Sequence, residues 1–227
     1  NTGFPISFEG IYKWIAFVHS KRSSSTSKHI PVPNRYFGVF EDDGSSLKVR
    51  GLEMRRRDNP PFFDKFQTEV LKVIAKGNTI EEVRMLLMPQ VKVVLNKYVQ
   101  LLKDRKVPLQ ELVFTKQLSK DSDSYVVNTI ESAALRQLSA EGRTLRAGEI
   151  LQYVITNYYN NNKSSNKRAT PFELIDNKTT TSGADYDAQR YIELLVEVAH
   201  SVTEPFNFHG INFCAKQAPL GDYRTDN

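Results

Sequence analysis

Cysteine is nearly absent from this sequence, since Cys214 is the only one in 227 residues. A single thiol excludes an internal disulfide and fits a reducing compartment, so we expect a cytoplasmic protein. No apolar run approaches the roughly 18 residues of a membrane span, and we expect no membrane partner. No signal peptide is visible either, because the short apolar run at residues 11–18 has no small-residue cleavage site after it.

Recognisable catalytic motifs are also missing. The four histidines show no metal-ligand spacing with Cys214. There is no glycine-rich phosphate loop, and the serine-rich run 23–27 has no base within reach that could activate a nucleophile. We therefore predict no catalytic residue, no metal ligand and no cofactor bound by this chain.

What the sequence does contain is an excess of positive charge. Its 31 Lys and Arg residues against 26 Asp and Glu give a formal net charge of +5 and a pI of about 9.2. This excess favours a polyanionic partner, although many basic proteins bind none. Apolar residues make up 40% and aromatic residues 11%, which indicates a folded protein, and the length allows one or two domains.

The first part of the chain has the pattern of a small sheet. Residues 34–40 and the segment from Val49 alternate apolar and polar side chains, with Asp42-Asp43-Gly44 between them, which predicts a β-hairpin. Two shorter runs within residues 4–18 are rich in aromatic and β-branched residues and predict further strands. The Ser- and Lys-rich segment 19–33 is predicted to be a mobile loop.

A domain boundary is predicted at Asn59-Pro60-Pro61, where the hydrophobic period changes from two to about 3.6. The chain is thereby divided into a small antiparallel sheet at residues 1–60 and a mainly helical part at residues 61–227, which is an α+β fold. In the second part, Thr79 is the predicted N-cap of a helix whose capping box is completed by Glu82, and Pro89 is expected to kink or split this helix. The other predicted elements are a helix ending near Gly77, a short strand at 112–114, a helix at 130–140, a strand at 150–155 and a helix at 186–202.

Short motifs follow one another in a fixed order along the chain. They are Glu9-Gly10-Ile11-Tyr12-Lys13, Arg35-Tyr36, Arg50-Gly51-Leu52-Glu53, Arg56-Arg57-Asp58, Lys116-Gln117-Leu118-Ser119-Lys120, Arg146-Ala147-Gly148-Glu149, Arg168-Ala169-Thr170-Pro171 and Tyr186-Asp187-Ala188. In this order and spacing the set resembles the family B DNA polymerases of the archaeal type. The resemblance lies in the part that runs from the edge of the palm through the thumb to the C-terminus.

The resemblance implies a palm-fragment sheet followed by a mainly helical thumb that grips primer-template duplex DNA. Phosphate contacts from Arg, Lys and polar side chains position a duplex without reading its sequence. The chain departs from the family at Pro33 and Asn34, where two lysines are usual, so we expect one or two phosphate contacts either to be lost or to be supplied by Lys28. The expected DNA-binding residues are Lys13, Lys28, Asn34, Arg35, Tyr36, Arg56, Lys116, Ser119, Lys120, Tyr125, Arg146 and Arg168. Alternatives remain open: Tyr36 could simply pack. Arg55-Arg56-Arg57 could form a solvated strand edge, or some of these arginines could pair with Glu53 or Asp58 instead of touching DNA.

The segment Asp121-Ser122-Asp123-Ser124 imitates the carboxylate motif that binds metal in the polymerase palm. A metal site would need a tight hairpin that brings both carboxylates beside a third. Lys120 precedes this segment, however, and its order in the chain places it in the thumb, so we predict a polar loop. The Mg²⁺ of a polymerase is therefore expected at the active site of a partner chain.

Two functional hypotheses follow. In the first, the chain is the C-terminal part or small subunit of a polymerase, inactive alone, and a large polypeptide supplies the carboxylates and the nucleotide site. In the second, it is a stand-alone, non-enzymatic DNA-binding module. Strands at 4–18 and 35–52 would form a sheet with open edges and no helix to cover it, which favours the first hypothesis. The chain does not begin with Met, so we expect that it is trimmed or cut from something longer.

Overall fold

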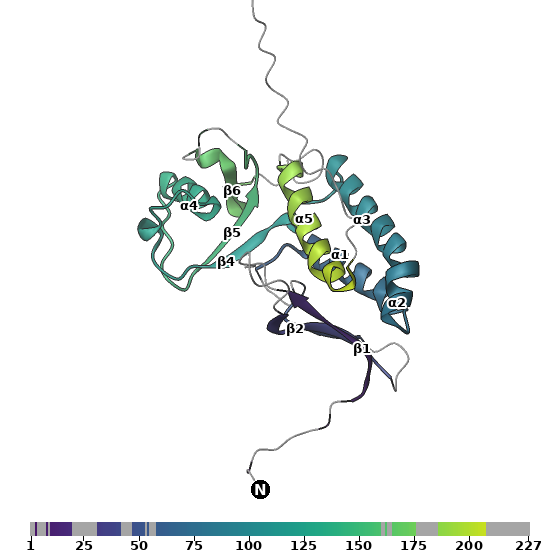
Figure 1. Ribbon diagram of the computed structural model, residues 1–227. Coiled ribbons are helices and arrows are strands. Elements are labelled where there is room, and N and C mark those ends of the chain that lie inside the picture. The colour runs from purple at the N-terminus through teal and green to yellow at the C-terminus, as the bar shows by residue number, and fades with distance from the viewer. Residues whose placement is uncertain are drawn as a thin grey trace, which may run out of the picture.

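The computed structural model describes residues 3, 8, 10–19, 31–41, 47–52, 54, 58–159, 162, 165–175 and 186–207. The strands are β1 (Tyr12–His19), β2 (Pro31–Phe40), β3 (Leu47–Arg50), β4 (Phe114–Gln117), β5 (Ile150–Ile155) and β6 (Ala169–Pro171). The helices are α1 (Pro61–Ile74), the short α2 (Ile80–Glu82), α3 (Met88–Lys103), α4 (Ile130–Ala140) and α5 (Ala188–Thr203). Strands β1 to β3 lie at one end, α1, α3 and α5 lie in the middle, and β4 to β6 with α4 lie at the other end (Figure 1). The predicted α+β fold is confirmed.

The first sheet has the strand order β1-β2-β3, and both pairs are antiparallel. Side chains alternate along β1, so that Trp14, Ala16 and Val18 are buried whereas Lys13 and Phe17 are exposed. This alternation is the period-two pattern of a strand with one buried face. The pairing of β2 with β3 confirms the predicted hairpin.

The ends of the predicted loop 19–33 belong to strands, because β1 extends through His19 and β2 begins at Pro31. Residues 20–30 between them lie outside the described residues, as do the predicted turn at 42–44 and the tail that follows Asn207. Predictions that concern these segments stay predictions.

Helices α1, α3 and α5 pack against one another in the middle of the molecule. Phe66 on α1 and Tyr98 on α3 have ring centroids 5.2 Å apart. Tyr191 on α5 is fully buried, and its hydroxyl donates to the Leu112 carbonyl oxygen at 2.7 Å and accepts the Ile155 N–H at 3.1 Å. This side chain therefore ties the helices to the second sheet. Within the described residues, none of the helices combines the length and apolar character that crossing a bilayer requires.

The local signals at the start of α2 act as predicted. The Thr79 hydroxyl accepts the Glu82 N–H at 3.1 Å, and the Glu82 carboxylate accepts the Asn78 N–H at 2.9 Å, which together form a capping box shifted by one residue. A π-helical turn follows at Val83–Leu87, and Pro89 stands in the first turn of α3 directly after it. The expected interruption at Pro89 is therefore found just before the proline, where the helical hydrogen bonds change their spacing.

The second sheet, with the order β4-β5-β6, is also antiparallel, and α4 packs against β5 and β6. The predicted strand at 112–114 is wrong, because Leu109–Leu112 forms a 3-10 turn and the strand begins at Phe114. Leu112 is fully buried in the helical core instead of pairing in a sheet, whereas the Phe114 ring stacks on Tyr153 of β5 at a centroid distance of 5.6 Å. The part predicted to be mainly helical thus carries a sheet of its own.

Residues from the far end of the chain cover the inner face of the first sheet, contrary to prediction. Phe206, in the 3-10 turn after α5 (Glu204–Phe206), has its ring centroid 5.8 Å from that of Trp14 and 6.0 Å from that of Phe37. The Trp14 indole N–H also donates a 2.8 Å hydrogen bond to the Gly77 carbonyl oxygen. The buried residues on both sides of the predicted boundary at residue 60 form one continuous core. The division into two domains stays a prediction.

Candidate nucleic-acid interface

Two adjacent segments at one end of the second sheet carry exposed cations. The Leu118 N–H donates to the Glu149 carbonyl oxygen at 2.9 Å, and the Gly148 N–H donates to the Leu118 carbonyl oxygen at 2.8 Å. These bonds continue the pairing of β4 with β5 beyond the strands. The Asp121 carboxylate accepts the Ala147 N–H at 2.8 Å, so the two segments are held side by side.

Lys116, Lys120 and Arg146 project from these segments, and we call them the basic tip. All three are exposed. Among the described residues, Lys116 and the Arg146 guanidinium have no hydrogen-bond or ion-pair partner. Lys120 is held in place, because its Nζ donates to the Ser124 carbonyl oxygen at 2.5 Å and lies 4.9 Å from the centroid of the Tyr125 ring. The basic tip therefore offers two unpaired cations and one fixed cation to a polyanion.

The predicted residues Ser119 and Tyr125 hold the backbone next to Lys120, since the Ser119 N–H donates to the Tyr125 hydroxyl at 3.3 Å. Glu149 fixes the turn that carries Arg146, because its carboxylate accepts the Arg146 N–H at 2.5 Å. We did not predict these supporting roles of Glu149 and Asp121. Asp121 and Ala147 are 26 positions apart, so their bond leaves no local signal in the sequence, whereas Glu149 bonds only three residues back within its own turn.

The segment that begins at Asp121 forms a polar turn, which agrees with the prediction. Ser122–Ser124 is a single 3-10 turn, and the Asp123 carboxylate is exposed beside the Ser122 hydroxyl at 3.4 Å. The described part of the chain contains no group of three or more His, Cys, Asp or Glu side chains that could hold a metal ion. The Asp121 carboxylate is instead engaged in joining two segments of backbone.

Of the predicted residues on the first sheet, Tyr36 and Lys13 contact other side chains. The Tyr36 ring lies 5.9 Å from the Phe17 ring on the outer face of the sheet, so it does pack, which was the alternative to a phosphate contact. The exposed Lys13 Nζ donates to the Asn78 side-chain oxygen at 3.3 Å. The DNA-binding roles of Tyr36 and Lys13 stay predictions.

Arg35 is positioned by the backbone that follows β3. Its Nε donates to the Gly51 carbonyl oxygen at 3.0 Å. Asn34 precedes it in a left-handed conformation with φ of 61°, and Gly51 has φ of 67°. The Arg-Gly motif thus holds the Arg-Tyr motif, which gives a physical reason for both to occur in one chain.

Replacing Gly51 with Ala should destabilise the protein by about 2 kcal/mol. A residue with a side chain is strained at the positive φ of this position, and its Cβ atom would overlap the Asn34 carbonyl oxygen. Urea denaturation of the two proteins measures the loss. Gly142→Ala is the matched control: its φ is 77°, but a Cβ there meets nothing within 4 Å, so we expect a loss of about 1 kcal/mol. Equal losses at the two positions would argue against the overlap.

Arg168 has a different environment from the one its predicted role requires. It is 8% exposed, its Nε donates to the Tyr158 carbonyl oxygen at 3.3 Å, and its Nη1 donates to the Asn128 carbonyl oxygen at 3.3 Å. The guanidinium also lies 5.3 Å from the centroid of the Tyr158 ring. These contacts hold the backbone around β6, so we leave Arg168 out of the proposed interface. The predicted residues Lys28 and Arg56 lie outside the described residues.

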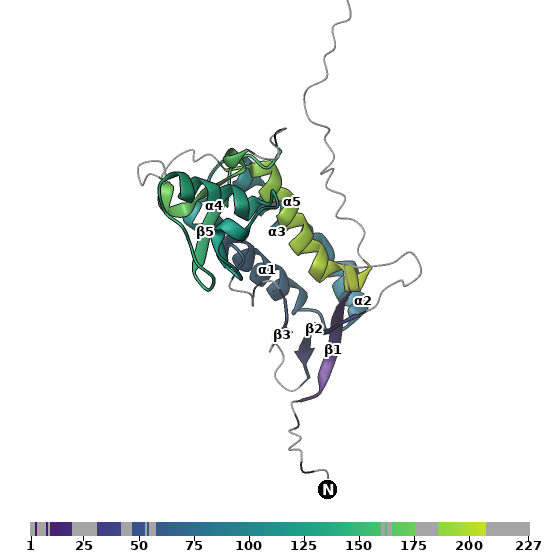
Figure 2. The ribbon, with the colours of Figure 1, turned by 90° about the vertical axis from the view of Figure 1, so that its left-hand side faces the viewer.

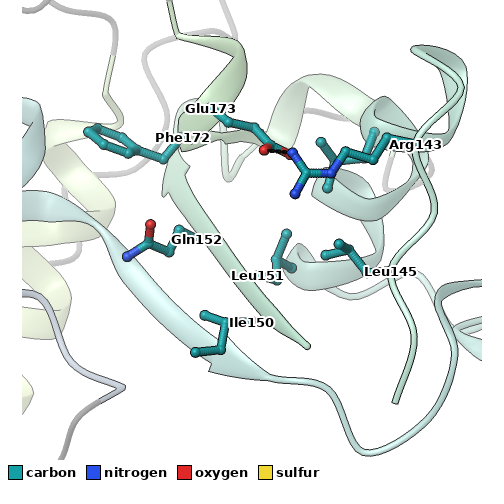
Figure 3. A pocket seen from close by; sticks show the side chains of 8 residues that line it. Arg143, Leu145, Ile150, Leu151, Gln152, Phe172 and Glu173 are labelled. Atoms are coloured by element: carbon teal, nitrogen blue, oxygen red, sulfur yellow. Dashed lines mark hydrogen bonds and ion pairs between the residues drawn. The ribbon is translucent and has the colours of Figure 1, made fainter. Parts of the chain in front are cut away.

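A hollow of about 360 Å³ adjoins the basic tip between α4, β5 and the turn Phe172–Leu174 (Figure 3). The Arg143 guanidinium, the one cation in its lining, forms an ion pair with Glu173. Leucine, isoleucine and phenylalanine side chains supply most of the remaining lining, namely Leu138, Leu145, Ile150, Leu151 and Phe172. Because its cation is neutralised, the hollow is poorly suited to the phosphates of a nucleotide.

Asp64, in the first turn of α1, has an unusual protonation equilibrium. Burial and the nearby Asp58 raise its pKa from 3.8 to about 6, and one of its carboxylate oxygens is buried with no hydrogen-bond partner in the described structure. The raised pKa means that the folded state binds the proton more tightly than the unfolded state does. Stability should therefore fall as pH rises from about 4 to about 6 and then level off.

Asp64→Asn should remove this loss. Because Asp64 is partly exposed, we expect the variant to gain about 1 kcal/mol over the parent at pH 7.5 and little at pH 4. Urea denaturation at the two pH values measures the difference. Asp123→Asn replaces an exposed acid and serves as the control, and a gain that does not depend on pH would contradict the raised pKa of Asp64.

The fold and the basic tip define an α+β protein with a cationic edge suited to a nucleic-acid backbone. Residues 5–206 match the family model described as DNA polymerase family B. The chain therefore belongs to DNA polymerase family B, and it is of the archaeal type.

Individual relatives agree with this assignment. The chain is 29% identical to a DNA polymerase from Thermococcus gorgonarius over 83% of its own length and 20% of that protein. It is 28% identical to DNA polymerase 1 from Saccharolobus solfataricus over 88% of its length and 22% of that protein. The solved structure of the family B DNA polymerase from the hyperthermophilic archaeon Pyrobaculum calidifontis shares the fold, with a TM-score of 0.62 and 22% identity over 87% of this chain and 22% of that one. The chain thus spans about a fifth of the length of these relatives.

Proposed function

We propose that this chain is the duplex-gripping part of a family B DNA polymerase, made of the palm edge and the thumb. The observation that carries the proposal is the basic tip, where two unpaired cations and one fixed cation project from adjacent segments. Cations in this arrangement bind phosphates without regard to base sequence, as an enzyme that copies any template requires. Arg35, held by Gly51, is the proposed contact on the palm side.

We further propose that a separate, larger polypeptide supplies the metal-binding carboxylates, with their Mg²⁺, and the nucleotide site. The support is that relatives of this chain are about four times as long, and that the first sheet ends at β1 and β3 with edges that no other described strand occupies. Unpaired strand edges are sites where another chain can add. The single Cys214 favours the cytoplasm as the place of this assembly.

A stand-alone DNA-binding module is the second candidate. The observation in its favour is that Phe206 covers the first sheet from within the chain, so the sheet has a buried face without a partner. In this case the basic tip would bind duplex DNA and no polymerase activity would depend on it.

Primer extension separates the two candidates. We expect the purified chain to extend no primer alone, and to support extension when it is mixed with the family B polypeptide of the same source that carries the palm carboxylates. Extension by the chain alone would overturn the need for a partner. Duplex binding without any such polypeptide in the source would favour the stand-alone module.

A further inference from the structure

A stripe of exposed apolar side chains runs along the outer side of the helix that begins at α2. We call Met85, Leu86, Pro89 and Val93 the apolar stripe. Met85 is 73% exposed, Leu86 is 62% exposed and Val93 is 67% exposed, and Pro89 is exposed as well. Met85, Pro89 and Val93 follow one another at intervals of four residues, so they lie on the same side of the helix.

The π-helical turn explains why the apolar stripe faces outward. Val83, Leu87 and Met88 are buried against the core, and the wider turn leaves three residues between Val83 and Leu87 on the outside. Such turns are frequent at functional sites. On α5, by contrast, the exposed residues are all polar, namely Gln189, Glu197 and His200. Single exposed apolar residues are ordinary, but a contiguous stripe of them marks an interaction surface.

The charges beside the apolar stripe restrict what can cover it. Arg84 and Lys92 are exposed, and neither has a polar partner among the described residues. Glu81 is the exposed acid at the start of the stripe. A second copy of this chain, with its net charge of +5, is a poor match for these cations. Duplex DNA is a poor match for the aliphatic side chains between them. An apolar segment with acidic flanks matches both features.

The position of the apolar stripe identifies the chain that carries this segment. The residues just before α2 are joined to the first sheet, since Trp14 donates to the Gly77 carbonyl oxygen and Lys13 donates to Asn78. Both ribbon views show α2 beside β1, far from the end that carries β4, β5 and the basic tip (Figures 1 and 2). A chain that adds to the open edge of β1 would therefore reach the apolar stripe and leave the basic tip clear.

We propose that the apolar stripe docks an apolar, acid-flanked segment of the polypeptide that supplies the catalytic carboxylates, an inference that rests on the proposed function. Aliphatic burial along Met85 and Val93 contributes most of the affinity. Arg84 and Lys92 select for acidic flanks and make the association sensitive to salt. The contact lets the chain bind its partner and duplex DNA at the same time.

The test measures the affinity of this chain for that polypeptide, without DNA, by titration calorimetry. The double variant Met85→Glu with Val93→Glu should bind at least roughly tenfold more weakly. The new carboxylates would have to be buried in an apolar contact, and they would repel the acidic flanks of the docked segment. The matched control is Val126→Glu with Val127→Glu, which introduces the same two glutamates in place of apolar side chains that are 82% and 69% exposed near the basic tip. We expect its affinity for the polypeptide to equal that of the parent.

Each outcome decides the proposal. Equal affinities of the two double variants overturn the docking site, even if primer extension at saturating polypeptide still supports the proposed function. Failure of any carboxylate-bearing polypeptide to bind overturns both proposals.

Sedimentation of the parent chain alone tests whether a second copy occupies the apolar stripe. Self-association that Met85→Glu with Val93→Glu abolishes would assign the apolar stripe to a second copy and contradict the proposal. A salt-dependent loss of affinity in Arg84→Glu with Lys92→Glu supports the acidic flanks.

Discussion

Replacement of Trp14 with alanine should destabilise the protein by about 4 kcal/mol, which is typical of removing a buried tryptophan. Trp14 is 5% exposed, and its ring meets Phe37 and Phe206 edge to face. The variant would leave a cavity at the point where the first sheet meets the end of α5. It would also leave the Gly77 carbonyl oxygen without its donor. Urea denaturation, followed by circular dichroism, measures the loss.

Two further variants show where that loss comes from. Trp14→Phe keeps most of the ring contacts and removes the indole donor, so it should cost about 1 kcal/mol from the unsatisfied carbonyl and additional energy for the smaller ring. Phe17→Ala removes an aromatic ring from the outer face of the same strand, where Phe17 is 47% exposed, and should cost no more than about 1 kcal/mol. If Phe17→Ala were as damaging as Trp14→Ala, the inner face of the sheet would not be the buried one.

Reversing the two unpaired charges of the basic tip, with Lys116→Glu and Arg146→Glu together, should weaken duplex binding on the order of 100-fold at about 0.1 M salt. The physical reason is the loss of two phosphate contacts and the repulsion that replaces them. The slope of log K against log salt concentration should flatten by roughly 1.8 for the two contacts. Fluorescence anisotropy with duplexes of several unrelated sequences measures both effects, and all sequences should lose affinity equally.

The matched control reverses two exposed cations elsewhere, with Lys72→Glu on α1 and Lys103→Glu on α3. This variant has the same net charge as the first, so it reports how much of the loss is a general electrostatic effect. A small, uniform loss is expected from it. If the two variants lost affinity to the same extent, the basic tip would have no special place in DNA binding. A loss confined to some sequences would point to base contacts and contradict a phosphate grip.

The elements that local signals specify were predicted well. The capping box at Thr79 and Glu82 and the strand at residues 150–155 depend on residues close together in the sequence, and both are present. The strand after Leu112 was misplaced because an apolar residue can be buried in a sheet or between helices with the same local pattern. The packing environment decides between the two, and it is set by residues such as Tyr191 that lie far along the chain.

In the candidate site, too, the sequence identifies the residue type but not the environment of its side chain. Sequence motifs identified Arg146 and Arg168 alike, yet one guanidinium is exposed and the other is buried against carbonyl oxygens. An arginine that binds phosphate and an arginine that fixes a loop have the same side chain, and only the surrounding backbone distinguishes them. The supporting carboxylate of Asp121 was likewise taken for part of a polar loop, without its bond to Ala147.

The contact between Trp14 and Phe206 also constrains the order of events during synthesis. Trp14 emerges from the ribosome well before Phe206, which covers it from a turn that follows α5. Contacts between residues so distant in sequence close slowly, because the intervening chain must first be confined. Until then, the apolar face of the first sheet stays open to solvent and to other nascent chains. Slowing translation just before residue 206 should therefore lengthen the period in which this protein is most prone to aggregate.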